Sequence, residues 1–193
     1  LCNDTNDVGA IYAGFTFLSA GNTIRYNYLH DIIGTADEFE AVRGVYFDER
    51  FSGQNVYSNV FENVDGAVFI GSGRYNNIEK NIFIECGKSV IISRYGNPAT
   101  LESVPEYYDK NIWYSKFDWL ENLANDNPDA PKYNKINYNL YFNSPEIEFN
   151  EWKETFAECE MTNIGNKSSI DADIFADYGN GDYSIENNSS IFK

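Results

Sequence analysis

The chain has 193 residues, a net charge of −16 and an aromatic content of 17%. This length suffices for one domain with a hydrophobic core. The acidic charge repels phosphate backbones and anionic headgroups, so neither nucleic acid nor a membrane is an expected partner. No apolar run approaches the roughly 18 residues of a spanning helix. Abundant tyrosine and asparagine suit sugars, which present apolar faces and hydroxyl edges.

Two short motifs recur and interleave along the chain. The first starts with glycine or serine and continues with apolar residues, at positions 9–12, 44–47, 66–69 and 89–92. The second reads Asn-x-Ile/Val-x-x-Asn-x-apolar and starts at Asn22, Gln54, Asn76 and Asn134, with glutamine replacing the first asparagine once. The second and third copies of both motifs lie 22 residues apart. A shared period of this kind indicates a repeat architecture.

The period restricts the fold to two repeat classes. Repeats of about 20 to 25 residues with short β-branched runs fit a β-helix or a leucine-rich repeat. Leucine is scarce here, and isoleucine, valine and phenylalanine take its place. The sequence therefore predicts an all-β, right-handed parallel β-helix. Strands around 10–12, 45–47, 67–69 and 90–92 are expected to stack in parallel on successive coils.

The second motif also predicts a ladder of asparagines. Coils stack at the ordinary interstrand spacing of about 4.8 Å, so equivalent residues become neighbours. Stacked asparagines at a turn bond to the backbone above and below, as in other cross-β stacks. Asn27, Asn59 and Asn81 are the expected ladder, with a structural role.

Insertions stretch the period at two places. Extra residues occupy 34–42, between the first two repeats. A longer helical or loop excursion is expected at about 97–132, where the apolar spacing is helical. A short helix is expected at about 148–158, and residues 171–193 are interpreted as closing structure. We expect residues 1–193 to form a single β-helix domain, the C-terminal portion of a longer β-helix. Loops on one flank of such a fold supply the walls of binding grooves.

Carboxylates are the main candidates for catalysis. The chain has one histidine, His30, and no serine-hydrolase or nucleotide-binding motif, which leaves little material for those chemistries. Asp7 precedes the first glycine-led strand and Asp48 follows the second. Aligning the glycines puts Asp48 in a column with Ala13, Ile70 and Ser93. A charge in such a column breaks local consistency, as functional residues often do.

The same alignment sets a geometric condition on a catalytic pair. With Gly9 aligned to Gly44, Asp7 lies six positions before the column of Asp48, about 20 Å along a straight strand. Paired carboxylates of glycosidases lie within about 10 Å of each other. The pair therefore requires a sharp bend in the chain near Gly9.

These residues also carry a family resemblance. The segments 7–12, 22–31, 44–49, 68–74 and 76–86, with the closing segment 181–192, resemble secreted bacterial β-helix glycosidases of glycoside hydrolase family 141. Members act on plant cell-wall glycans such as xylan or fucosylated pectin. The resemblance implies that Asp7 and Asp48 are catalytic and that the protein is secreted, periplasmic or on the cell surface. The expected substrate-binding residues are Tyr12, His30, Tyr46, Glu49, Arg74 and Arg94.

The sequence and the resemblance leave three candidate functions. The leading prediction is a glycoside hydrolase that uses two carboxylates and needs no metal or other cofactor. The portion present here is not expected to hold the whole groove. A polysaccharide lyase or uronate epimerase is the alternative, although it needs cations and the chain has only 14 lysines and arginines. In that case Ca²⁺ would bind at a cluster such as Asp171 and Asp173. The third possibility is a non-catalytic glycan-binding solenoid.

Overall fold

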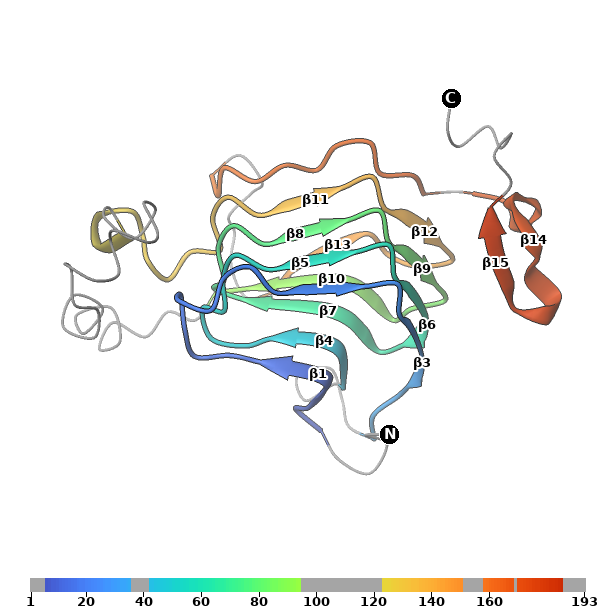
Figure 1. Cartoon of the computed structure of the whole chain (residues 1–193), viewed down its shortest axis with the longest axis horizontal. Helices are drawn as coiled ribbons and strands as arrows, with labels where there is room; N and C mark the ends of the chain where they lie inside the picture. The colour runs from blue at the N-terminus through green and yellow to red at the C-terminus, as the bar shows by residue number, and fades with distance from the viewer. Residues whose placement is uncertain (1–5, 36–41, 95–122, 151–157, 169, 186–193) are drawn as a thin grey trace.

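A computed structural model describes residues 6–35, 42–94, 123–150, 158–168 and 170–185 of the chain. Over these ranges the protein is all-β, without α-helices. Three sheets are parallel throughout, and a fourth is a small antiparallel pair near the C-terminus (Figure 1).

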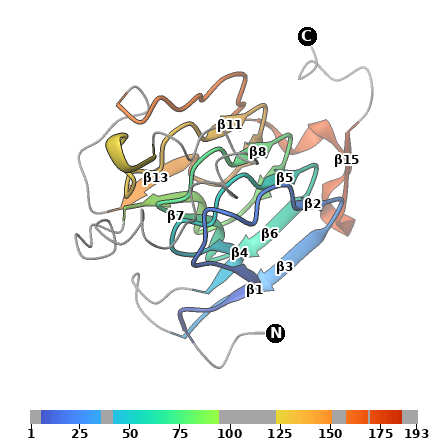
Figure 2. The same cartoon turned by 60° about the vertical axis from the view of Figure 1, so that its left-hand side comes forward.

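The strands alternate regularly among the three parallel sheets. The first sheet has the order β1 (Gly9–Ala13), β4 (Arg43–Phe47), β7 (Gly66–Gly71), β10 (Lys88–Ser93) and β13 (Ile147–Asn150). The second sheet contains β2 (Thr23–Arg25), β5 (Asn55–Tyr57), β8 (Asn77–Glu79) and β11 (Lys135–Asn137). The third contains β3 (Tyr28–Ile32), β6 (Val60–Val64), β9 (Ile82–Ile84) and β12 (Leu140–Phe142). We call each set of three successive strands, from β1–β3 to β10–β12, a repeat. Figures 1 and 2 show the repeats layered on one another.

The predicted parallel stacking is confirmed, but the alignment of the glycines is wrong by one position. Tyr12 pairs with Tyr46, and Tyr46 pairs with Phe69. Gly9 lies opposite Arg43 and not opposite Gly44. The period of the sequence gave the wrong alignment for the first sheet, because the insertions and turns around β4 change the spacing there. The second and third sheets keep their own register.

The core lies between the three parallel sheets. Alternate residues of β4, β7 and β10 point into it, as the two-residue period of a strand requires, whereas in β3 and β6 a left-handed residue, Asp31 or Asn63, breaks the alternation. Phe61, Phe83 and Tyr141 stack face to face on successive repeats, with ring centroids 5.2 Å apart at both steps. Other buried members include Val45, Phe47, Val56, Val68, Ile70, Ile78, Val90, Ile92 and Ile136.

The predicted asparagine ladder is confirmed. The turn between the second and third sheets has two residues in each repeat, a left-handed residue followed by asparagine. The Asn59 backbone N–H donates to Asn81 Oδ1 (3.1 Å), and the Asn27 N–H donates to Asn59 Oδ1 in the same way. The ladder continues through Asn139 to Asn166. Each side chain thus satisfies the backbone of the neighbouring repeat.

The two expected helical segments are corrected in part. Of the excursion at 97–132, residues 95–122 lie outside the described residues; the remainder is a 3-10 turn (Leu123–Asn125) followed by further turns. The helix expected at 148–158 begins instead as strand β13, while residues 151–157 lie outside the description. Ile147 and Phe149 alternate into the core beside Val90 and Ile92. This alternation is the period of a strand, and pairing with β10 stabilises it.

A hairpin of β14 (Phe175–Asp177) and β15 (Asp182–Ile185) lies beside the third sheet (Figure 1). Phe175 contacts Phe142 edge to face, with ring centroids 5.7 Å apart. The Tyr178 hydroxyl donates to Glu85 (2.7 Å), and the Tyr183 hydroxyl donates to Glu62. The hairpin is therefore held by an apolar contact and by phenol–carboxylate hydrogen bonds.

Within the ranges described, no helix has the length and apolar character needed to cross a membrane.

Candidate functional site

A column of aromatic and apolar side chains runs along the first sheet, on the side that faces away from the core. Tyr12, Tyr46, Phe69 and Ile91 occupy equivalent positions on β1, β4, β7 and β10. Tyr12 and Tyr46 meet edge to face with ring centroids 5.2 Å apart, and Tyr46 meets Phe69 in the same manner at 5.0 Å. Tyr46 is buried, whereas 49% of Tyr12 is exposed. Tyr12 is thus the accessible end of the column.

Two glycines of the first repeat make room for this group. A Cβ at Gly9 would lie 2.6 Å from the Cβ of Tyr46, closer than real carbon atoms approach. A Cβ at Gly14 would lie 3.0 Å from the Cβ of Asp48. The glycine-led motif therefore permits close approach of the first two repeats beside the candidate carboxylate.

The tyrosine pair connects the two candidate carboxylates. The Tyr46 hydroxyl donates to Asp7 Oδ1 (2.9 Å), and the Tyr12 hydroxyl donates to Asp48 Oδ2 (2.9 Å). The other oxygen of Asp48 accepts the Glu49 backbone N–H (2.9 Å). The carboxylates thus flank two tyrosines that contact each other.

The pKa of Tyr12 depends on the carboxylates of the same group. Partial burial, the hydrogen bond to Asp48 and the negative charges of Asp48, Asp7 and Glu49 together raise the pKa of Tyr12 to about 12. The phenol therefore stays protonated near neutral pH and donates its hydrogen bond. All three predicted carboxylates act on this one hydroxyl group.

Asp48 does not lie in the predicted column with Ala13 and Ile70. Phe47, not Asp48, pairs with Ala13 and Ile70. Asp48 is the first residue after β4, beside Gly14, and its backbone N–H donates to the Ala13 carbonyl (2.9 Å). Its charge therefore interrupts no apolar ladder and instead begins a turn.

That turn is unusual within the repeats. Phe47 and Asn55 pair with Ile70 and Asn77, so the β4–β5 connection contains one residue more than the β7–β8 connection. Glu49 and Arg50 have φ angles of 21° and 67°. Non-glycine residues with positive φ are uncommon and are found at strained functional turns as well as at structural ones. The extra residue lies next to Asp48.

Asp7 lies at a turn of the backbone, but β1 then runs from Gly9 to Ala13 without interruption, so this turn does not shorten its path to Asp48 along the strand. Its φ is 52°, a left-handed value that turns the chain immediately before β1. The Asp7 side chain is exposed and reaches the Tyr46 hydroxyl. The bend expected near Gly9 therefore does not occur within the strand.

Of the remaining predicted substrate-binding residues, Glu49 joins this group, whereas His30, Arg74 and Arg94 do not. His30 lies on β3 in the third sheet, where it stacks on Tyr28 and bonds to Asp31 (2.9 Å). Glu49 forms an ion pair with Arg50 at 3.5 Å and does belong to the Asp48 turn.

Arg74 and Arg94 both form ion pairs with the segment around residues 126–130. Arg74 is 1% exposed and pairs with Asp126 at 3.0 Å, so the prediction that it lines an open groove does not fit its position. Its guanidinium also donates to the carbonyl of Ala130 (3.3 Å). Arg94 pairs with Asp129 at 2.5 Å. Neither role was readable from the sequence, because the partners come from the long excursion.

Arg43 is a member of the site that the sequence analysis missed. It is 4% exposed, and its guanidinium lies 5.9 Å from the ring centre of Tyr46 and 5.0 Å from that of Phe69. Cation–π contacts of this kind hold the rings in place. The sequence could have pointed to Arg43, because it is a charged residue directly before the apolar 44–47 motif.

Among the described residues, no group of three or more histidine, cysteine, aspartate or glutamate side chains lies close enough to hold a metal ion. The Ca²⁺ site considered for Asp171 and Asp173 thus lacks a third such ligand within those ranges. The site chemistry rests on carboxylates, phenols and a guanidinium.

Comparison with protein-family models, curated proteins and solved structures finds no match to this chain.

Proposed function

We propose that the chain is part of a right-handed parallel β-helix and acts as a glycoside hydrolase on a plant cell-wall polysaccharide of the xylan or fucosylated pectin type. The β-helix is supported by the strict rotation of the chain among three parallel sheets and by the asparagine ladder. Secretion, or a periplasmic or cell-surface location, belongs to the same proposal because such a polysaccharide is extracellular.

One observation carries the catalytic proposal: Asp7 and Asp48 are joined through a contacting tyrosine pair on adjacent strands. Glycoside hydrolysis uses two carboxyl groups, one as acid and one as base or nucleophile. The acid protonates the glycosidic oxygen while the second group attacks the sugar carbon or activates water. The exposed Tyr12 ring offers a sugar a surface beside both carboxyl groups.

The hydrogen bonds suggest how the two roles divide. Asp48 accepts from both the Tyr12 hydroxyl and the Glu49 N–H, so its carboxylate is fixed in one orientation. A fixed, charged oxygen suits the base or nucleophile. With Asp48 as the base or nucleophile, the acid role falls by elimination to Asp7, which accepts from the Tyr46 hydroxyl and would have to be protonated before the transfer. Tyr12 and Tyr46 position these groups.

The test is hydrolysis of xylan and fucosylated pectin by the protein and by its Asp48→Asn and Asp7→Asn variants. Each variant should lose a factor of about 10² to 10⁴ in kcat because it lacks a proton-transfer or nucleophilic group. Asp173→Asn, at an exposed acid on another part of the chain, is the matched control and should keep its rate. Circular dichroism should show that all three remain folded.

Normal turnover by Asp48→Asn would overturn the assignment. Products that carry a new carbon–carbon double bond, detected by ultraviolet absorbance, would identify a lyase instead. Binding of these glycans without turnover by the wild type would favour the non-catalytic solenoid.

A further inference from the structure

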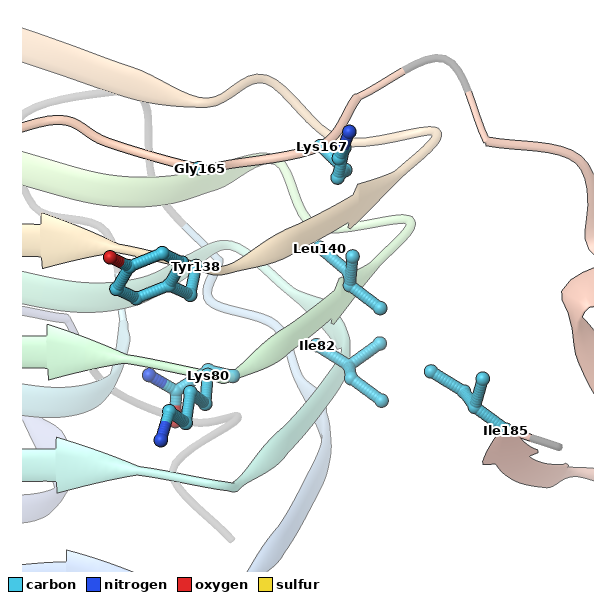
Figure 3. Close-up of a pocket in the computed structure, with 8 residues that line it drawn as sticks. Lys80, Ile82, Tyr138, Leu140, Gly165, Lys167 and Ile185 are labelled. Atoms are coloured by element: carbon cyan, nitrogen blue, oxygen red, sulfur yellow. The ribbon is translucent and has the colours of Figure 1, made fainter. Parts of the chain in front are cut away.

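A pocket lies outside the Asp7–Asp48 site, between the outer surface of the third sheet and the C-terminal hairpin. Its volume is about 390 Å³, within the range of small-ligand sites. Figure 3 shows Ile82, Leu140 and Ile185 converging on the space between β9, β12 and β15. Lys80, Tyr138, Gly165 and Lys167 line the rest of it, together with Asn81.

The constant two-residue turn places Lys80 beside Tyr138. Both are the left-handed first residues of this turn, with a φ of 57° each, in successive repeats. Residues at equivalent positions of stacked strands are about 4.8 Å apart along the backbone. A cation and an aromatic ring therefore become neighbours at the mouth of the pocket although 58 residues separate them in the sequence.

Tyr138 forms a fixed aromatic platform. A Cβ at Gly165 would lie 2.5 Å from Cδ1 of the Tyr138 ring, so the ring rests directly on the glycine backbone. More than half of Tyr138, 54%, is nevertheless exposed. A ring that is held from behind and open at the front suits stacking against the apolar face of a sugar.

The two lysines give the pocket a charge opposite to that of the whole protein. Neither Lys80 nor Lys167 forms an ion pair with a carboxylate among the described residues, whereas Lys88, Lys132, Arg74 and Arg94 all do. The protein carries a net charge of −16, so long-range attraction does not bring an anion here. An anion is therefore selected only by short-range pairing with the ammonium groups of Lys80 and Lys167.

We propose that this pocket binds an oligosaccharide that bears carboxylate groups, that is, uronic-acid units of an acidic polysaccharide. The sugar ring stacks on Tyr138 above the apolar floor of Ile82 and Leu140, and carboxylates of different units of the oligosaccharide pair with Lys80 and with Lys167, which lie on opposite sides of this floor (Figure 3). The site holds the polymer away from the hydrolytic centre and performs no chemistry. This proposal rests on the proposed function in one respect, because both take the ligand to be a polysaccharide.

The test is isothermal titration of the whole chain with a trimer of galacturonic acid and, separately, with neutral xylotriose. The acidic trimer should bind, and xylotriose should bind more weakly. The double variant Lys80→Gln/Lys167→Gln should lose about three- to tenfold in affinity, as expected for two exposed ion pairs. Tyr138→Ala should lose about tenfold, whereas Tyr138→Phe, which keeps the ring, should bind as the wild type does.

Lys135→Gln is the matched control, because Lys135 is exposed on β11 and does not line the pocket. It should not change the affinity. Equal binding of the two trimers, absence of binding, or an unaltered affinity in the double lysine variant would each overturn the proposal. The Asp48→Asn variant should bind normally, so a failure of hydrolysis and a failure of this site give different results.

Discussion

Two turns of the repeat behave differently, although both join neighbouring parallel sheets. The turn from the second to the third sheet always has two residues, at 26–27, 58–59, 80–81 and 138–139. The turn from the first to the second sheet changes in every repeat, at 14–22, 48–54, 71–76 and 93–134 when counted after the paired residues Ala13, Phe47, Ile70 and Ile92. The first kind holds the asparagine ladder, and the second holds Asp48 and Glu49.

A ladder of the same kind closes the variable turn, where the Gln54 N–H donates to Asn76 Oδ1 (2.9 Å) and the Asn76 N–H to Asn134 Oδ1 (2.8 Å), so the two turns differ in the residues that precede the ladder. In the constant turn, each asparagine side chain bonds to the backbone of the preceding repeat and only one turn residue stands before it, so any change in length leaves buried polar groups unpaired. The variable turn lies where the strands of the first sheet end, and it accepts insertions at low entropic cost. Function can therefore change in the variable turn while the constant turn preserves the stack.

Insertion of one glycine between Ser58 and Asn59 should have the largest effect. It shifts β6 by one residue relative to β3 and β9, which turns core side chains such as Phe61 outward. We expect a loss of at least about 5 kcal/mol in the free energy of unfolding, comparable to the stability of a typical domain. Urea denaturation followed by circular dichroism measures it.

The matched change in the variable turn is deletion of Glu49, which makes the β4–β5 connection as long as the β7–β8 connection. This variant should stay folded and should lose the hydrolytic activity proposed above, because Asp48 changes its position. Equal destabilisation by the insertion and the deletion would remove the distinction between the two turns.

Asn59→Ala should have the next largest effect. Asn59 is 1% exposed, accepts from the Asn27 backbone, and donates to the carbonyls of Ile24 and Tyr57. Its loss leaves several of these groups unpaired, so we expect destabilisation by about 2 to 4 kcal/mol. Thermal melting measures this, with the exposed Asn27→Ala as a milder control. Any glycan affinity of the folded protein should stay unchanged; a sharp fall in affinity at normal stability would contradict a structural ladder.

The smallest expected effect is a dependence of folding stability on pH, which arises from Asp126 in the variable turn. Burial acts to raise the pKa of Asp126, but hydrogen bonding from Lys132 and the charge of Arg74 outweigh it and hold the pKa below its usual value. The contribution of this carboxylate to stability is therefore complete above the unfolded pKa of about 3.9 and is lost as the pH falls through the lower folded pKa. Asp126→Asn should remove that part of the acid slope.

Urea midpoints of the wild type and of Asp126→Asn, compared from neutral pH downward, provide the measurement. The difference between the two proteins should shrink as the solution becomes acidic. A difference that stays constant with pH would show that the Asp126 charge contributes nothing to folding.

Part of the candidate site could be predicted from particular residues. Tyr12 and Tyr46 lie on apolar strands, Asp7, Asp48 and Glu49 lie just before or after these strands, and the structure brings the five together. Arg74 and Arg94 could not be understood in the same way, because their partners Asp126 and Asp129 come from a distant segment of no regular period. The pocket at Tyr138 was also missed, since Gly165 and Ile185 follow the last clear repeat.

The sequence alone determined the parallel stack and its asparagine ladder, because both depend on a local period that recurs along the chain. Only the tertiary structure decided the register of the first sheet, the strand at Ile147–Asn150 and the turn that carries Asp48. In each case a contact with a neighbouring repeat outweighs the local pattern: pairing with β10 stabilises β13, and one additional residue in the β4–β5 turn sets where Asp48 lies. Periodicity specifies which residues repeat, whereas non-local pairing specifies which of them meet.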